Sequence, residues 1–283
     1  MLENKIDFVV YFTVENANPN GDPLSGNMPR QDNELFGIVS DVCIKRKIRN
    51  RMQDLGHNIF VQANERIVDG HKSLEKRFEE QFPKAQKVAD DEVASALCDK
   101  YLDIRSFGQV VTFQKRSIGI RGPVSVTMGK SIEPVSITSM QITRSTNGME
   151  AEVGKERSSD TMGMKHFVDQ GLYCFSGSIN PYFSEKTKFS KEDAEVIKEA
   201  LKTLFINDAS SARPDGSMEV KRVYWVEHPN KMGVLSSAKV KALFNCEISE
   251  DEHGFERYRF NEDEKQIEEL KERGASVEIS EGL

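Results

Sequence analysis

The sequence predicts an α+β fold, in which helices cover an antiparallel sheet. Strand-like and helix-like segments alternate along its 283 residues, a length sufficient to bury a full core in one elaborated domain or in two. The first strand is predicted at Ile6–Glu15, where β-branched and aromatic residues dominate. A helix is predicted next, from Phe36 to Leu55, because Gly56 ends an amphipathic stretch.

The remaining segments continue this alternation. Residues 59–101 are rich in Glu, Lys, Ala and Asp and predict short helices inserted after the first strand and helix. Further strands are predicted at Gln109–Phe113, Gly119–Met128 and Gly171–Pro181, then a helix capped by Ser190 that runs to about Ile206, and a last strand at Glu219–Glu227. This order is that of a ferredoxin-like sheet, the arrangement of an RNA-recognition fold.

The loop at Asn16–Pro23 separates the first strand from the predicted helix. Its Asn20-Gly21 pair accepts positive φ at little cost, and Pro19 and Pro23 cannot sit inside a regular ladder. We therefore expect the loop to leave the strand and expose backbone amides, which are groups that can hold a phosphate.

The helix that follows carries a run of basic residues with no acidic residue among them. Its apolar stripe consists of Ile44, Ile48, Met52 and Leu55, and its flanks carry Lys45, Arg46, Lys47, Arg49 and Arg51. We expect the stripe to dock on the sheet and the basic faces to stay in solvent. A plain solvated helix is the alternative, but the single charge sign favours a phosphate-binding face.

Composition bounds the class of protein. The net charge is −7, yet thirteen acidic and five basic residues fall in 247–283, so the rest of the chain is close to neutral and can bind a phosphate backbone locally. No apolar run is long enough for a signal or a membrane span, and we expect a cytoplasmic protein without a membrane contact. The four cysteines are isolated and predict neither disulfides nor a zinc site.

Catalytic chemistry is not indicated. The five histidines are scattered, and no phosphate loop of known spacing is present. Asp22 and Asp32 could ligate Mg²⁺, but two carboxylates on one loop are a weak pattern. We predict no catalytic residue, no cofactor and no metal.

Two motifs place arginine beside a strand end: Asp103–Gly108 (Asp-Ile-Arg-Ser-Phe-Gly) and Ile120–Val124 (Ile-Arg-Gly-Pro-Val). Arg105 and Arg121 could contact phosphates, and Phe107 could stack on a base. Equally, Phe107 could be core and both arginines could form surface ion pairs. The residues leave both interpretations open.

Several motifs taken together resemble a known family, the Csd-type backbone subunit of the type I-C CRISPR surveillance complex (Cascade), of the RAMP superfamily. The motifs are Asn18–Pro23, Asp103–Gly108, Ile120–Val124, Thr161–His166 with Gly171–Tyr173, and Met218–Arg222 through Glu227–Gly233. The resemblance implies one elaborated domain with an RNA-recognition-type palm (about 1–56, 102–142 and 166–246), helical fingers (57–101), a projecting β-hairpin thumb (143–165) and an acidic C-terminal segment (247–283).

The resemblance also implies a function. Such a subunit is not an enzyme; it polymerises head to tail along CRISPR guide RNA and presents the guide for pairing with target DNA in antiviral defence, beside other Cascade subunits. Two alternatives stay open: a guide-processing endoribonuclease of the same superfamily, although its Gly-rich loop has no clear counterpart here, and a general single-strand RNA-binding module.

The residues expected to bind RNA follow from the motifs and the basic helix. Ser40 to Arg46 is similar to a Ser-x-x-x-x-Lys-Arg stretch that opens the guide-binding helix in related subunits, so Lys45, Arg46 and Arg49 are the leading phosphate ligands. The full set is Asn18, Asn20, Gly21, Ser40, Lys45, Arg46, Arg49, Arg105, Phe107, Arg121, Met162, Lys165, His166 and Lys231. One departure is that the thumb is acidic (Glu150, Glu152, Glu156, Asp160), which favours a steric wedge over an electrostatic contact.

Overall fold

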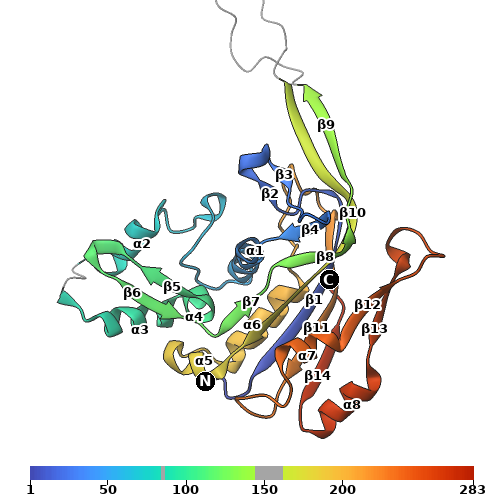
Figure 1. The fold of residues 1–283 in the computed structure, drawn as a ribbon. Coiled ribbons are helices and arrows are strands. Elements are labelled where there is room, and N and C mark those ends of the chain that lie inside the picture. Colours follow the sequence, from blue (N-terminus) through green and yellow to red (C-terminus); the bar gives the residue numbers. More distant parts are fainter. Residues whose placement is uncertain (84–86, 144–161) are drawn as a thin grey trace, which may run out of the picture.

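The computed structural model describes residues 1–83, 87–143 and 162–283, which combine helices with antiparallel sheet (Figure 1). Within this part of the chain the main sheet has eight strands, in the order β14-β11-β1-β10-β8-β4, with β7 and β9 also paired to β10. Its strands are β1 (Ile6–Ala17), β4 (Phe36–Val39), β7 (Val124–Val126), β8 (Gly129–Pro134), β9 (Ile137–Thr143), β10 (Met162–Ile179), β11 (Met218–Glu227) and β14 (Ser276–Ser280).

Two layers cover the sheet. On one face, α1 (Asp41–Asp54) and α6 (Lys191–Lys202) pack together, and Ile48 and Ile197 join Phe12 of β1 in one core cluster. On the other face lie α7 (Ser237–Ala242), α8 (Glu264–Glu272) and the hairpin of β12 (Phe244–Ile248) and β13 (Tyr258–Glu262) (Figure 1). The sheet is therefore buried on both faces near its centre.

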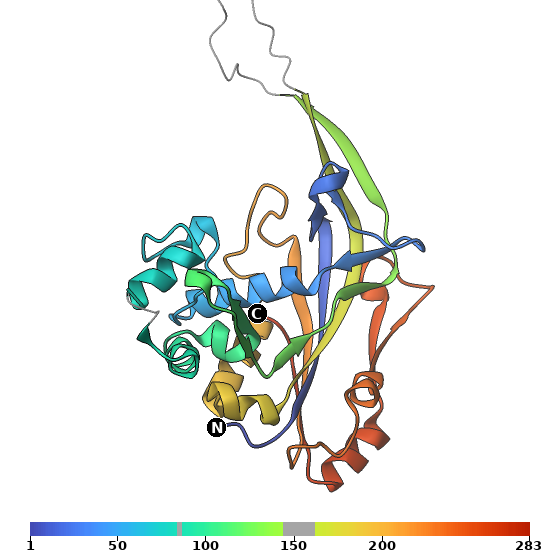
Figure 2. The ribbon, with the colours of Figure 1, turned by 60° about the vertical axis from the view of Figure 1, so that its left-hand side comes forward.

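The short helices predicted in residues 59–101 are found as α2 (Leu74–Gln81) and α3 (Asp90–Lys100). The insert extends beyond the predicted end, because α4 (Leu102–Phe107) and the hairpin of β5 (Gly108–Val111) and β6 (Ile118–Arg121) pack into the same cluster. It has a core of its own, which includes Phe60, Phe78, Leu97 and Ile104. Figures 1 and 2 show the insert beside α1, on the same side of the sheet.

The predicted helix over Phe36–Leu55 is wrong in its first turn. Phe36–Val39 is strand β4, which pairs with β8, and α1 begins only after Ser40. The Ser40 hydroxyl accepts the N–H of Cys43 (3.3 Å), and the Ser40 N–H donates to Asn20 Oδ1 (2.9 Å), so the helix start is fixed by a cap that periodicity alone does not reveal. The end is as predicted, with Gly56 at φ +88°.

The turn chemistry predicted for Asn20-Gly21 is also wrong. Positive φ occurs instead at Asn16 and at the pair Gly26-Asn27, which turns the short hairpin of β2 (Gly21–Asp22) and β3 (Met28–Pro29). Glycine is needed at position 21 for space, since a Cβ there would lie 2.0 Å from Asn27 Oδ1.

Two strand predictions need new bounds. The strand predicted at Gly119–Met128 is divided into β6 and β7, which pair with different partners. Strand β10 is longer than predicted, and its first part pairs with β9 from Thr143↔Met162 to Ile137↔Val168. This two-stranded ribbon extends away from the sheet (Figures 1 and 2). Residues 144–161, the middle of the predicted projecting segment, lie outside the described residues.

The acidic C-terminal segment is folded. It supplies the last two residues of β12 and all of β13, α8 and β14, and β14 pairs with β11 from Val223↔Ser280 to Glu227↔Ser276. Some of its apolar residues are buried in the core on the α8 face of the sheet, among them Ile267 and Leu270. In the part of the chain that the structure describes, no helix combines the length and apolar character needed to cross a bilayer.

Candidate nucleic-acid interface

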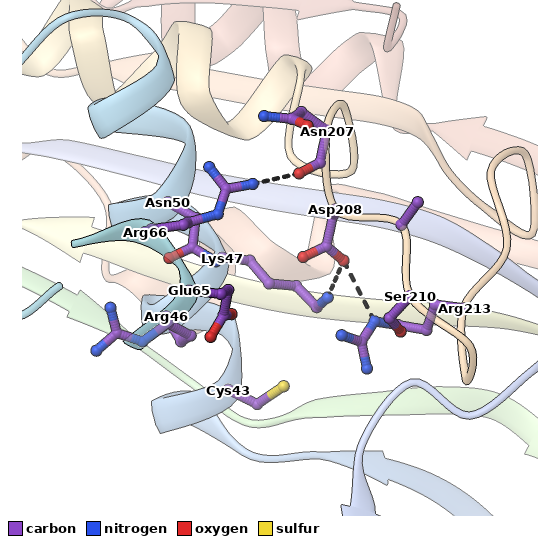
Figure 3. Close-up of a pocket in the computed structure, with 11 residues that line it drawn as sticks. Cys43, Arg46, Lys47, Asn50, Glu65, Arg66, Asn207, Asp208, Ser210 and Arg213 are labelled. Atoms are coloured by element: carbon purple, nitrogen blue, oxygen red, sulfur yellow. Dashed lines mark hydrogen bonds and ion pairs between the residues drawn. The ribbon is translucent and has the colours of Figure 1, made fainter. Parts of the chain in front are cut away.

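A basic groove lies between α1, the start of the helical insert and the loop that joins α6 to β11 (Figure 3). Its cavity measures about 440 Å³. Four cationic side chains and two carboxylates line it. The lining residues are Cys43, Arg46, Lys47, Asn50, Glu65, Arg66, Asn207, Asp208, Ala209, Ser210 and Arg213.

Helix α1 supplies one wall through its spacing. Cys43, Lys47 and Asn50, with Arg46 beside them, recur at intervals of three and four residues and so share a side of the helix. The opposite side carries the predicted apolar stripe, of which Ile44, Ile48 and Met52 are buried. The docking of that stripe therefore turns the groove-facing residues outward.

The loop after α6 supplies the other wall. Asn207 adopts φ +57°, and the backbones of Ser210 and Arg213 exchange two hydrogen bonds (2.8 and 3.0 Å), which closes a tight turn. The turn places Asp208 and Arg213 opposite α1 (Figure 3).

Asp208 joins the two walls. Its carboxylate pairs with Lys47 and with Nε of Arg213 (3.4 Å). Lys47 is almost fully buried beside the ring of Phe205, and burial lowers the pKa of its ammonium group. The expectation that the basic faces of this helix stay in solvent is thus wrong for Lys47, which is held inside the protein by Asp208.

Arg46 and Arg66 connect the groove to neighbouring backbone. Arg66 donates to Asp54 (2.6 Å) and to the carbonyl of Asn207, which lies 141 positions later in the chain. Arg46 donates through Nη1 to the Val61 carbonyl (2.6 Å). Burial lowers the pKa of its guanidinium, but an arginine stays protonated in proteins. Each guanidinium has five N–H donors, so donors are left over for an anion in the groove.

The other basic residues predicted on α1 are held by acidic partners. Lys45 forms an ion pair with Asp41 (3.1 Å), and Arg49 Nε donates to the buried Asp103 (3.1 Å) while its guanidinium lies 4.9 Å from the ring centre of Phe107. Arg49 is therefore a strut between α1 and the insert, which corrects the expectation that it faces away from the core.

The two strand-end arginines differ. Arg105 forms a fork with both carboxylate oxygens of Asp193 (2.9 Å each), so for this residue the ion-pair interpretation is the one found. Phe107 is half-buried and packs against the main core. Arg121 is exposed and lies 4.0 Å above the ring of Phe183.

The loop residues predicted to bind phosphate form local structure. Asn18 is buried and donates to the carbonyl of Asn27 (2.7 Å), and Asn20, Gly21 and Ser40 serve the hairpin and the helix cap described above. The hydrogen bonds of Asn18, Asn20 and Ser40 are made within the protein, which lowers the value of these residues as phosphate ligands.

The remaining predicted residues lie away from the groove. Met162, Lys165 and His166 are on the ribbon, where His166 Nδ1 contacts the Ser139 hydroxyl (2.7 Å). Lys231 pairs with Glu185 of α5 (Pro181–Thr187), which lies at the opposite end of the molecule from the ribbon in Figure 1. The structure thus brings only Arg46 of the predicted set into the groove.

Sequence reasoning missed Arg66, Arg213 and Asn207. Each lies in a polar segment with no periodic pattern, and the fold alone brings the segment of Arg66 next to the loop that carries Asn207 and Arg213. The one available signal was Arg213-Pro214 within a Gly- and Ser-rich turn, which marks a loop without indicating its partners.

The weak Mg²⁺ candidates carry cationic partners. Asp22 pairs with Arg30 (3.4 Å), and Asp32 pairs with Lys130 (2.7 Å), whose hydrogen bond lowers the pKa of the Asp32 carboxyl. Among the residues described, no three His, Cys, Asp or Glu side chains are grouped so that they could hold a metal ion.

Comparisons with known proteins agree with one another. The sequence model of the family described as CRISPR-associated protein Cas7 matches residues 4–270. A curated relative, CRISPR-associated protein Cas7 of Haloferax volcanii, is 25% identical over 212 residues, which cover 69% of this chain and 62% of the relative's length.

One solved structure supports the same fold, and a second is similar at a lower score. A chain of a CRISPR RNA-guided surveillance complex, pre-nicking, superposes with a TM-score of 0.50 at 13% identity and covers 78% of both chains. A chain of another CRISPR RNA-guided surveillance complex has a TM-score of 0.44 at 14% identity and covers 98% of this chain and 88% of its own. Since the family match extends over nearly the whole sequence, the chain belongs to the CRISPR-associated protein Cas7 family.

Proposed function

We propose that this protein is a guide-RNA-binding backbone subunit of a CRISPR surveillance complex, of the Csd type found in type I-C systems. The observation that carries the proposal is the basic groove, where Arg46, Arg66 and Arg213 converge from three separate segments. Guanidinium groups match phosphate oxygens in geometry and charge, and three of them line the groove. It is therefore suited to the RNA backbone.

The fold supports the architecture implied by the resemblance. The strand order β11-β1-β10-β8, with α1 and α6 on one face, supports a ferredoxin-like palm. The insert at residues 57–101 corresponds to the fingers, and the ribbon of β9 and β10 forms the base of a thumb. The groove lies where the palm helix α1 meets the insert.

The proposed mechanism is positional. Copies of the subunit associate head to tail on the guide, and a contact that does not close on itself gives a helical filament. Phosphates held at a fixed repeat leave the guide bases free to pair with target DNA, so the protein need not read the sequence. Other Cascade subunits complete the assembly. We propose no catalytic step.

The groove can be tested by charge removal. In the triple variant R46Q/R66Q/R213Q, the slope of log affinity for single-stranded RNA against log salt should flatten by about 0.7 for each lost phosphate contact. The matched control is K265Q/K271Q/R273Q, which removes three exposed cations on and beside α8. Equal slopes in the triple variant and the wild-type protein would remove the groove from the binding site.

Two further measurements separate the alternatives. RNA that co-purifies with the protein and its operon neighbours should be a discrete repeat-derived species, whereas heterogeneous RNA would favour a general single-strand binder. Labelled repeat RNA and single-stranded DNA, incubated with the protein with and without Mg²⁺, should stay intact. Cleavage that is lost in D22A would instead support the endoribonuclease alternative.

A further inference from the structure

The motif at Asp103–Gly108 contains a fully buried carboxylate that the proposed RNA contacts do not use. Asp103 accepts the backbone N–H of Phe60 (2.8 Å), the backbone N–H of Val61 (3.0 Å) and Nε of Arg49 (3.1 Å). A buried carboxylate with three donors is well satisfied, and breaking one of them is costly. Asp103 therefore fixes the backbone at Phe60 and Val61.

The same short segment holds a groove arginine from its other side. The carbonyl of Val61 accepts Nη1 of Arg46 at 2.6 Å. Val61 is thus bound at its N–H by Asp103 and at its carbonyl by Arg46, while Arg49, one turn after Arg46 on α1, anchors Asp103 to the same helix. The result is a closed circuit of contacts between α1 and the insert.

Such a circuit has a consequence for binding. A free arginine side chain has many rotamers and loses that freedom when it grips an anion, whereas a guanidinium already held in place loses less. Because Val61 engages one edge of the Arg46 guanidinium, the direction in which its remaining N–H groups point is set before any ligand arrives.

We propose that Asp103 is a positioning residue that orients Arg46, through Val61, for contact with an RNA phosphate. The proposal rests on the proposed function of the groove. Asp103, the first residue of the motif Asp103–Gly108, would then affect RNA binding without contacting RNA itself.

The test is a double-mutant cycle with a fluorescein-labelled polyuridine strand as the probe. D103N keeps the shape of the side chain but presents an NH₂ group where two backbone N–H groups need acceptors. D103N and R46Q should each weaken RNA binding by roughly tenfold, the fold-change expected for one charge-assisted hydrogen bond. The double variant should bind like R46Q alone, because Asp103 acts only through Arg46. Independent losses that multiply in the double variant would overturn the proposal.

The control is R105Q, which breaks an ion pair on the same helix, α4, that does not contact Val61. It should lower the melting temperature without changing RNA affinity. A loss of affinity in R105Q as large as in D103N would show a general effect of loosening α4 and would contradict positioning.

R46K decides the matter if D103N fails to fold. Lysine keeps the charge but lacks the planar fork, so it cannot hold the Val61 carbonyl and a phosphate in one fixed geometry. Its affinity should fall several-fold, and wild-type affinity in R46K would overturn the proposal. If the wild-type protein does not bind RNA, the proposed function itself is refuted. If it binds RNA but the losses in D103N and R46Q multiply, only the positioning role of Asp103 is refuted.

Discussion

Arg105 of α4 holds both carboxylate oxygens of Asp193, the third residue of α6, at 2.9 Å each. The same carboxylate accepts the backbone N–H of Ser190 (2.9 Å), and the Ser190 hydroxyl accepts the N–H of Asp193 (3.1 Å). One side chain therefore closes the capping box of α6 and connects that helix to the insert.

Two variants should separate the contribution of the ion pair to stability from that of the capping box. R105M leaves the capping box intact but removes the ion pair and the hydrogen bond from Nη1 to the Cys98 carbonyl (2.6 Å), and it should lower the free energy of unfolding by about 1–2 kcal/mol. D193A also removes half of the capping box and should cost about 1 kcal/mol more. Chemical denaturation followed by circular dichroism measures both. Equal losses in the two variants would show that the cap contributes nothing.

The pair of Lys47 and Asp208 should respond unequally to loss of either member. D208N leaves a buried ammonium group without its carboxylate and should cost about 3 kcal/mol. K47M leaves Asp208 with Arg213 as a partner and fills the space beside Phe205 with an apolar chain, so its cost should be smaller. A larger loss in K47M than in D208N, measured by urea unfolding, would contradict this account.

Asp69 gives the insert a defined acid sensitivity. Hydrogen bonds from the Arg77 guanidinium lower the pKa of this carboxyl from 3.8 to about 2. A depressed carboxyl pKa stabilises the fold above the ordinary value, and the contribution is lost as the pH falls toward the folded-state value. The difference in melting temperature between wild type and D69N should therefore shrink between about pH 4 and about pH 2. A difference that stays constant across this range would exclude the linkage.

The thiols should be slow to react in the native protein. Burial raises the pKa of Cys98 and of Cys174 to about 11 and that of Cys246 to about 12, so the thiolate is scarce near neutral pH. Ellman's reagent should label these residues slowly before denaturation and rapidly after it. Prompt labelling of Cys98 in the folded protein would show that α3 opens locally.

The ribbon should matter for assembly more than for folding. Thr143 and Met162 are direct partners at its end, so a two-residue Asn-Gly turn can replace residues 144–161. Apolar side chains near this end are about half exposed or more: Met140, Ile142, Met162 and Met164. The shortened protein should keep its melting temperature and bind short RNA, yet form no long assemblies on a full guide. Mass photometry with RNA would detect full-length assemblies, which would place the contact between copies elsewhere.

Strands β1, β10 and β11 and helices α1 and α6 could be predicted in large part from the sequence because their signals are local. Alternation in Ile6–Glu15 and the cap at Ser190 depend on neighbours within a few residues. Strand β4 was missed because its pairing with β8 joins segments about 90 residues apart. Strand β14 was missed because it lies in the acidic segment, and its partner β11 lies far away in the sequence.

The site was harder to predict than the fold. Charge on α1 indicated a phosphate-binding face, but charge does not show which cations already have carboxylate partners. Asp103 and Asp208, which bind Arg49 and Lys47, lie 54 and 161 positions away from them. Only Arg46 combined a predicted role with a place in the groove.

Strand β10 runs unbroken for 18 residues, from the tip of the described ribbon to the centre of the sheet. At about 3.3 Å per residue it spans close to 60 Å, and in mechanical terms it is a cantilever with its base clamped between β1 and β8. A force applied at the tip passes along the backbone of β10 into the core, because β10 has no loop between the ribbon and the sheet. Contacts made at the ribbon therefore act directly on the part of β10 that pairs with β1 in the core.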